Sequence, residues 1–569
     1  MVNNTDTSTD RAQFVLNPET ATVPNGINNV GGSNTIAASN FPPAYHLARP
    51  YVGAYIQDDW RATSSLTLNL GLRWEFIGAP IETNGHFANL VPAQTGLTSD
   101  GISRFYIPQA QVVNEPAAFQ ALLAKNGIVF TPVSGNGLVL AQKTNFAPRL
   151  GFAYQVSPKL VARGGYGIFY QGNENHGLSI SNYINFPFQV SSSYNAGNST
   201  TPLTPDNSVG ALQNGLVNIP LTADAAASSS KTSLGLYGEP YHARTSYAQA
   251  YHLQLQYQLA ANMVATLAYV GASARHLQAG EPSNTVSSIL PPSANANTNS
   301  FFPGFATNGT FIARAAATNY NGLQVNVERR FSQGFSLLAN YTNSKCLGDA
   351  RDMLDNEIGS YRAPYVPGVG IAADYGLCDI DVRQIVHVSG IYELPFGKNK
   401  PFLTSGPAAW ILGGWSTNWI FFAQDGQPLT IACTTTNAAG LGCNALTVPG
   451  QNPYAGHHNA AQFLNPAAFA NPPAATATSA SPAHLGGAPT QVTGPPFRRL
   501  NLSVVRQFPA FRETSFEFRV EVFNLTNTPN FGQPGNLDFS NTNTFASISA
   551  TRDNPDDPRE LQFSLKYYF

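Results

Sequence analysis

Segments in which apolar and polar residues alternate strictly recur along the chain, and they limit its fold more than any other feature. Residues 66–76 (LTLNLGLRWEF) carry Leu, Trp or Phe at each even position and Thr, Asn, Gly, Arg or Glu at each odd one. Successive side chains of a strand point to opposite faces, so one face is apolar and the other polar. These eleven residues match the roughly 9–11 that a tilted strand needs to cross a bilayer.

About thirteen strands are predicted, and most follow one another in pairs across a short polar turn. They are 51–60, 66–76, 145–156, 160–170, 247–259, 263–273, 319–331, 335–345, 383–394, 414–425, 498–508, 514–525 and 561–569. Long connections separate the pairs, at 77–144, 171–246, 274–318, 346–382, 426–497 and 526–560. Short turns at one rim and long loops at the other are typical of an outer-membrane barrel. The expected fold class is therefore all-β, a transmembrane antiparallel β-barrel with long extracellular loops.

The low charge of the chain agrees with an exterior that faces lipid. Charged residues make up 11%, against about 25% in ordinary soluble domains, and ionised groups are costly in lipid. The apolar faces carry only Arg329 and Arg506, both near a strand end, where the cost of a charge falls to about 0–1 kcal/mol. All five Trp lie in or next to predicted strands, as in an aromatic girdle.

Composition also excludes other classes of protein. No segment approaches the roughly 20 consecutive apolar residues of a membrane-spanning helix. The net charge of -2 lacks the basic surface of a nucleic-acid binder, so no nucleic-acid partner is expected. A hydrophobic content of 43% with 35 Phe excludes a disordered chain. We expect the bacterial outer membrane as the location and its lipid as a partner.

The odd number of predicted strands bears on the domain organisation. A single-chain bacterial barrel normally has an even number of strands and closes on itself. Thirteen strands indicate that an N-terminal part is missing, or else that residues 11–17 (RAQFVLN) supply a fourteenth strand. We expect 1–50 to be a loop or partial strand segment and 51–569 to be the barrel.

Six stretches carry a resemblance to a known family. They are 55–76 (YIQDDWRATSSLTLNLGLRWEF), 145–170 (NFAPRLGFAYQVSPKLVARGGYGIFY), 319–342 (NYNGLQVNVERRFSQGFSLLANYT), 381–398 (DVRQIVHVSGIYELPFGK), 413–430 (GGWSTNWIFFAQDGQPLT) and 518–532 (FRVEVFNLTNTPNFG). With the aromatic last strand ending at Phe569, they resemble the C-terminal barrel of a TonB-dependent outer-membrane receptor, most similar to the large Oar-like branch. Together they span most of the chain from Tyr51 onwards.

The resemblance implies a 22-stranded barrel, an N-terminal plug, a short box gripped by the energy-coupling TonB complex, and import of a scarce ligand driven by the inner-membrane proton gradient. Residues 1–10 show no secretory signal. Plug and box are not found, and about nine strands of the family barrel are absent. We therefore expect a fragment, coupled to TonB only if the missing N-terminal part is present. The barrel assembly machinery is a further implied partner, with Phe563, Leu565, Tyr567 and Phe569 as the assembly signal.

The polar strand faces predict residues that line the barrel lumen. These are Arg73, Glu75, Arg163, Gln254, Gln256, Asn326, Glu328, Arg519 and Glu521. A barrel interior is polar in any case. We therefore favour opposite charges that pair across neighbouring strands and hold the wall, and keep a ligand path as the alternative.

The four cysteines lie in long loops or at their boundaries. Disulfides persist outside the cell, and among the three possible pairings we choose Cys346 with Cys378 and Cys433 with Cys443. Their spacing lacks the C-x-x-C pairs of a zinc site. Free thiols are the alternative.

Other candidate sites are weak, and neither a cofactor nor a metal is expected. The loop acids Asp349, Asp352, Asp355, Glu357, Asp374, Asp379 and Asp381 would suit Ca²⁺, but they lack the EF-hand order, so a solvated acidic loop is favoured. Gly368, Gly370 and Ala373 satisfy the dinucleotide motif without its strand and helix, and the pair His457 and His458 has no third ligand nearby. No catalytic motif is recognised, and we do not expect an enzyme.

Three functions are compared. The resemblance favours an outer-membrane receptor or transporter component for uptake of a scarce ligand. A surface-exposed binding or adhesion protein that acts through its long loops is the alternative. An extracellular all-β hydrolase is disfavoured, because the strand faces are poor in charge. The ligand, whether a small molecule, an oligosaccharide or a peptide, is not specified by any motif.

Overall fold

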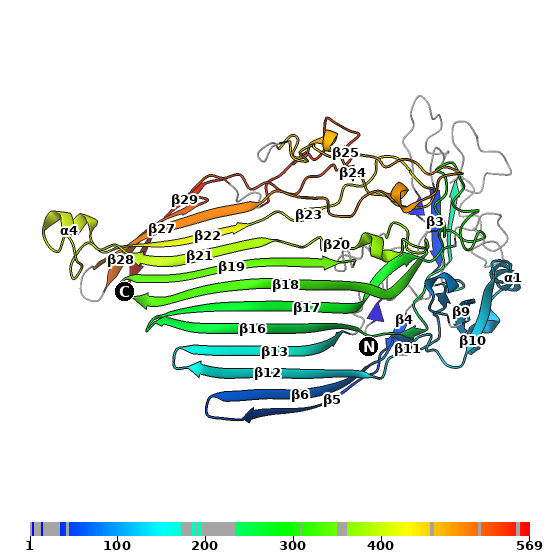
Figure 1. The fold of residues 1–569 in the computed structure, drawn as a ribbon, viewed down its shortest axis with the longest axis horizontal. Coiled ribbons are helices and arrows are strands. Elements are labelled where there is room, and N and C mark those ends of the chain that lie inside the picture. The colour runs from blue at the N-terminus through cyan, green and yellow to red at the C-terminus, as the bar shows by residue number, and fades with distance from the viewer. Residues whose placement is uncertain are drawn as a thin grey trace.

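Strands dominate the structure, a computed structural model (Figure 1). It describes residues 3–4, 13–14, 35–40, 45–98, 100–171, 185–188, 190–195, 234–307, 309–349, 361–455, 460–509, 514–552 and 558–569.

Thirteen strands form one antiparallel sheet in which each strand pairs with the next along its path. They are β5 (Tyr51–Arg61), β6 (Leu66–Ile77), β12 (Asn145–Ser157), β13 (Leu160–Gln171), β16 (Ser246–Ala260), β17 (Met263–Pro282), β18 (Thr310–Ser332), β19 (Phe335–Gly348), β21 (Gln384–Glu393), β22 (Trp415–Gln424), β27 (Phe497–Pro509), β28 (Ser515–Phe523) and β29 (Glu560–Tyr568). The short β20 (Gly376–Leu377) pairs with the end of β19. Every one of the thirteen predicted segments overlaps one of these strands.

The apolar rows lie on one face because the register places them opposite one another. Leu70 of β6 is opposite Leu150 of β12, and Leu255 of β16 is opposite Leu267 of β17. Leu70 is 39% exposed and Leu255 is 43% exposed. These side chains lie on an outer surface and not in a compact interior, so their face is the lipid-facing side. Asp58 of β5 is opposite Leu70 and shares this face, so the expectation that Arg329 and Arg506 are the only charges on it is wrong. The other face of the sheet is the lumen-facing side.

The sheet has two edges among the described residues. β5 pairs with β6 and β29 pairs with β28. The alternative fourteenth strand is not part of this sheet. Within 11–17 the structure describes β2 (Gln13–Phe14), which pairs with β3 (Thr35–Asn40), and β3 pairs in turn with β14 (Val190–Asn195).

β17 and β18 continue beyond their predicted ends, so the expectation of a loop throughout 274–318 is wrong. The two strands have 20 and 23 residues, and their pairing passes through register shifts beside Leu277. Neighbouring residues there are buried on both faces, as Phe311 and Ile312 are, at 0% and 3% exposed. Loops cover both faces of these strand ends, and a period of two residues therefore no longer marks the strand.

The long connections fold into a structured region at the end of the strands opposite the short helix α4 (Gly406–Leu412) (Figure 1). We call the described residues of 77–144, 171–246, 274–318, 346–382, 426–497 and 526–560 the loop cap. Its smaller elements are β7 (Ile81–Glu82), β8 (Asn89–Val91), β9 (Ser103–Pro108), β10 (Ile128–Val133), β11 (Leu140–Ala141), β15 (His242–Ala243), β23 (Pro428–Leu429), β24 (Leu446–Thr447), β25 (Phe469–Ala470), β26 (Val492–Thr493), the helix α1 (Ala117–Lys125) and five 3-10 helices, Ala93–Thr95, Gln109–Asn114, Ile371–Asp374, Pro466–Ala468 and Pro482–Leu485. In the N-terminal segment, β1 (Asn3–Asn4) pairs with β4 (Tyr45–Ala48), and β4 with β7. None of the described helices has both the length and the hydropathy to cross a membrane.

The buried core lies mainly in the loop cap and not in the wall. Phe105, Phe119, Phe186 and Phe305 come from three different long connections and pack in one cluster, with the rings of Phe119 and Phe186 4.4 Å apart. A second cluster around the fully buried Phe545 joins the last two long connections. The cap is therefore folded protein, held by the burial of apolar surface.

The face assignment predicts different outcomes for adjacent substitutions in β6. Leu70→Arg places a charge on the lipid-facing side and should impair membrane insertion by about 2–4 kcal/mol if the site lies at mid-bilayer. Asn69→Arg should have little effect, because Asn69 is on the lumen-facing side and already donates to Asp59 (2.6 Å). Urea titration of folding into lipid vesicles measures both. Equal effects would contradict the assigned faces.

Candidate functional site

Glycines on the lumen-facing side of β6, β12 and β13 leave a hollow of about 720 Å³ in the wall. Gly151 is opposite Gly165, and Arg149 lies between Gly71 and Gly167 in the register. Because these glycines have no side chain, the floor of the hollow is main chain at their positions. A ligand group is therefore able to approach the backbone closely.

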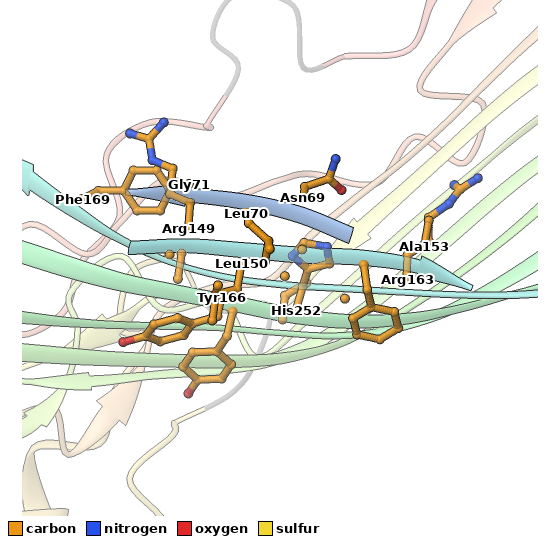
Figure 2. Close-up of a pocket in the computed structure, with 18 of the residues that line it drawn as sticks. Asn69, Leu70, Gly71, Arg149, Leu150, Ala153, Arg163, Tyr166, Phe169 and His252 are labelled. Carbon is orange, nitrogen blue, oxygen red and sulfur yellow. The ribbon is translucent and has the colours of Figure 1, made fainter. Parts of the chain in front are cut away.

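Cationic and aromatic side chains surround this hollow. Figure 2 shows Arg149 and Arg163 on the same side of the sheet as Asn69, and Tyr166 on the other side. The guanidinium carbon of Arg149 lies 4.9 Å from the ring centre of Phe169. Guanidinium groups on a polar wall suit the binding of an anionic or hydrogen-bond-accepting group.

His252 closes the floor of the hollow beside Gly165. A Cβ atom added to Gly165 would lie 2.7 Å from Cε1 of His252. The imidazole therefore occupies the space that a side chain at position 165 would need, and any larger residue there would displace it.

The predicted pair Arg73 and Glu75 forms a network at the end of β6 near the cap. Their side chains are 2.8 Å apart at Nε and Oε1. Tyr51 on β5 donates its hydroxyl proton to Glu75 (2.6 Å) and accepts from Arg73 (2.8 Å). The expectation of ion pairs across neighbouring strands is wrong for this pair, because residues i and i+2 share a face and the long arginine side chain spans between them. The cross-strand link is the tyrosine.

Arg519 repeats this arrangement on β28. Its guanidinium lies 3.0 Å from Glu517 and 3.4 Å from Glu521, both on the same strand. The neighbouring β29 contributes Tyr568, whose hydroxyl donates to Glu517 (3.3 Å). These contacts bind polar groups of the wall to one another.

The remaining predicted lumen residues all lie on the lumen-facing side but are not gathered at one place. Gln254 is opposite Arg163, and Gln256 follows it on the same side of β16. Asn326 donates to Asn340 across β18 and β19 (2.6 Å), and Glu328 is exposed two residues further on. Of the nine predicted lumen residues, Arg163 lines the hollow.

Two disulfides tie down the later loops of the cap. They join Cys346 to Cys378 and Cys433 to Cys443, the pairs that the sequence analysis chose, with Cα–Cα distances of 5.4 and 5.5 Å. The first closes the connection after β19, where the amide of Cys378 also donates to the carbonyl of Cys346 (3.1 Å). Both links restrict the unfolded loops and so favour the folded cap.

Arg362 connects two of the cap loops from a buried position. Its Nε lies 2.7 Å from Asp374, and both side chains are less than a tenth exposed. Nη1 donates to the carbonyls of Leu485 (2.9 Å) and Gly487 (2.7 Å), which belong to the next long loop. A buried charge held by a carboxylate and several carbonyls fixes the two loops against one another.

The other candidate metal and cofactor residues have structural partners or lie in turns. Asp349 accepts from the amide of Ala317 (2.6 Å), and Asp381 from that of Cys346 (2.6 Å). Gly370 precedes the 3-10 helix Ile371–Asp374. Across the part of the chain that the structure describes, no three His, Cys, Asp or Glu side chains are close enough to hold a metal ion. Asp352, Asp355, Glu357, His457 and His458 lie outside the described residues.

The hollow and most of its lining were not predicted from the sequence, although a signal for the hollow is present there. The run GGYG at 164–167 places glycine at two successive lumen-facing positions, 165 and 167, and 151 adds a third on the neighbouring strand. Glycine weakens a strand interior and often marks a close backbone approach. Its recurrence on one face of adjacent strands therefore indicates a recess.

An antiparallel wall with a lipid-facing apolar side, a polar lumen-facing side and a cap of long loops defines an outer-membrane β-barrel protein. The family model described as "Outer membrane beta barrel domain" matches residues 2–562. The chain belongs to this family, and its location is the outer membrane.

Receptors and transporters are among the solved structures that resemble the chain. The pyoverdine receptor FpvA from Pseudomonas aeruginosa PAO1 is 10% identical, with a TM-score of 0.38 over 92% of this chain and 43% of its own. The iron transporter FrpB from Neisseria meningitidis is 10% identical (TM-score 0.37, 92% and 46%), and the transporter YddB from Escherichia coli is 8% identical (TM-score 0.38, 94% and 54%). The chain thus spans about half or less of their length. No curated protein matches the sequence significantly.

The buried Glu115 predicts a pH dependence of the cap. Burial raises the pKa of this carboxyl from 4.5 to about 8, and neither oxygen has a hydrogen-bond partner among the described residues. Because the folded state binds the proton more tightly, the free energy of unfolding should fall as pH rises from 4.5 to about 8, and level off above it. Hydrogen exchange of the α1 amides, measured across this pH range, gives the free energy of unfolding of the cap. Glu115→Gln should abolish the decline, and exposed Glu560→Gln should not.

The link made by Arg362 predicts a large cost for its removal. Arg362→Met leaves Asp374 buried without its cation and should destabilise the cap by about 3–5 kcal/mol. The control is Arg104→Met, which breaks the ion pair with Asp100 on the cap surface and should change little. Urea dependence of limited proteolysis in the cap measures both. Similar curves for the two variants would contradict the assigned role of Arg362.

Proposed function

We propose that the chain forms part of an outer-membrane receptor or transporter that takes up a scarce ligand, in the Oar-like branch of the TonB-dependent receptors. The observation that supports this most is the glycine-floored hollow with Arg149 and Arg163 in a wall whose strands also carry a structured cap. A small molecule, an oligosaccharide or a peptide with anionic or hydrogen-bond-accepting groups suits these arginines. Membership of the outer-membrane barrel family supports the same role.

Partners and chemistry follow from this proposal. The proposal includes coupling to the TonB complex only if the same protein also carries a segment that binds this complex. Assembly would use the barrel assembly machinery, which would recognise the exposed apolar row of β29 and the last residue: Phe563, Leu565, Tyr567 and Phe569. We also propose that the role is not enzymatic, since no catalytic motif is recognised in the sequence.

Uptake by cells tests the proposal. Cells that express the native gene are offered labelled ferric citrate, maltotriose or cyanocobalamin, with and without a protonophore. At least one probe should accumulate, and only without the protonophore. Arg149→Ala and Arg163→Ala should each lower its uptake about tenfold, because a hydrogen bond to a charged group contributes about 1.5 kcal/mol or more.

A control residue outside the hollow separates ligand contact from folding. Arg61→Ala lies at a short turn, where Arg61 donates to the carbonyl of Ser64 (3.3 Å), and should leave uptake unchanged. Energy-dependent accumulation that is equally insensitive to all three substitutions would remove the hollow from the ligand path.

A second function, surface binding or adhesion, is favoured by the cap itself. Its apolar clusters and two disulfides give the loops a defined shape without any contribution from the lumen. This function predicts ligand retention at the cell surface that neither a protonophore nor Arg149→Ala affects. That result would replace the transport proposal.

A further inference from the structure

The connection between β21 and β22 lies at the short-turn end of the wall (Figure 1) and carries several exposed apolar side chains. Residues 401–424 contain no charged side chain, and they include α4. Trp410, Ile411 and Leu412 of this helix are 71%, 58% and 50% exposed, and Phe402 is 59% exposed. A helix that is apolar and yet uncovered is poorly suited to water.

Two side chains of the wall hold α4 at its C-terminal end. Arg506 donates through Nη1 to the carbonyl of Ile411 (2.7 Å) and through Nη2 to that of Trp410. Trp415 donates its indole N–H to the same Ile411 carbonyl (3.0 Å). These bonds satisfy carbonyl groups that a helix end leaves unpaired.

The position of these two residues shows on which side of the wall α4 is held. Arg506 and Trp415 are opposite one another in the register of β27 and β22. Arg506 follows Leu502 and Val504 at alternate positions, so it belongs to the lipid-facing row. Because its guanidinium binds the helix, α4 is joined to the lipid-facing side at the short-turn rim.

The same contacts explain an arginine in the lipid-facing row. Its guanidinium carbon lies 5.9 Å, 5.6 Å and 4.3 Å from the ring centres of Trp410, Trp415 and Phe508, and Arg506 is 9% exposed. Aromatic faces and the negative end of a helix both stabilise a cation. The charge is thus enclosed and the apolar surface of α4 is turned outwards.

We propose that α4 and the preceding Phe402 form a membrane-surface anchor, inserted at the boundary between headgroups and acyl chains of the leaflet at the short-turn rim. The continuity of α4 with the lipid-facing row supports lipid as the occupant. Exposed Lys398, three residues before the segment, suits anionic phospholipid headgroups, and Trp410 suits the interface. The inference depends on the outer-membrane location and not on the proposed uptake function.

Fluorescence of Trp410 in vesicles tests the anchor. The full chain is reconstituted into phosphatidylethanolamine vesicles with a minor share of phosphatidylglycerol, and the emission of Trp410 is obtained by subtracting the spectrum of Trp410→Phe. Phosphatidylcholine brominated near the headgroup end of its acyl chains should quench this emission by about half, because interfacial Trp lies at headgroup depth. Acrylamide in the water should quench it little.

The opposite pattern would overturn the anchor. Emission that acrylamide quenches and brominated lipid does not would place α4 in water, and insensitivity to both would indicate cover by protein, including a second copy of the chain. Neither result bears on uptake, which is measured separately.

A variant of Arg506 tests how the anchor is positioned. Arg506→Lys keeps the charge but cannot bind both carbonyls in the same way, so acrylamide quenching of Trp410 should at least double in vesicles as the helix is released. Arg499→Lys, on the lumen-facing side of the same strand, is the matched control and should change nothing. The mobility of unheated samples in gels confirms folding of each variant. If Arg506→Lys does not fold, the quenching measured on the unaltered chain still decides the proposal.

Discussion

Inside a bilayer every main-chain N–H and C=O group has to find its partner within the protein, because no water is present to take its place. The antiparallel sheet of thirteen strands meets this requirement for the eleven inner strands, each of which has a partner on both sides, whereas the edge strands β5 and β29 each pair on one side among the described residues. The pairing in turn fixes which side chains share a face, so Leu70, Leu150 and Leu255 fall on the lipid side and Arg73 and Arg163 on the other. The buried apolar cluster lies in the loop cap, because the cap is surrounded by water and the hydrophobic effect operates there.

Arginine side chains have different partners on the two sides of the wall. On the lumen-facing side, Arg73 and Arg519 bind carboxylates two residues away on their own strand, with a tyrosine from the next strand. On the lipid-facing side, arginines occur near strand ends and lie against rings, as Arg329 does at 5.0 Å from the centre of Phe335. Rings hold a cation without adding a second charge to desolvate, which suits a surface bordered by lipid.

The wall was predictable from sequence and the cap was not, for a physical reason. Where one face meets lipid and the other the lumen, the period of two residues appears directly in the sequence, and even the short turns follow. Where loops bury both faces, as around Phe311 and Ile312, that period disappears. The core of the cap joins residues far apart in the chain, such as Phe119 and Phe305, and no local pattern links them.

The candidate site divides in the same way. The lumen-facing orientation of Arg163 and Gln254 followed from alternation alone, and the pairing chosen for the cysteines is the one that the structure has. The hollow depends on which glycines are neighbours across strands, and the role of Arg506 depends on a helix that packs back onto the wall. The hollow and the role of Arg506 each depend on contacts between different strands or elements. The sequence of a single segment carries no information about such contacts.

The length of the β17–β18 hairpin has a mechanical consequence. At about 3.4 Å per residue a strand of 23 residues extends about 75 Å, more than twice the roughly 30 Å of the hydrocarbon layer. Its outer part is a ribbon standing beyond the bilayer, and apolar residues of the cap pack on it. The ladder of main-chain hydrogen bonds in this hairpin runs from the short-turn rim to the cap, with register shifts beside Leu277. The hairpin therefore links the folded cap directly to the short-turn rim of the wall.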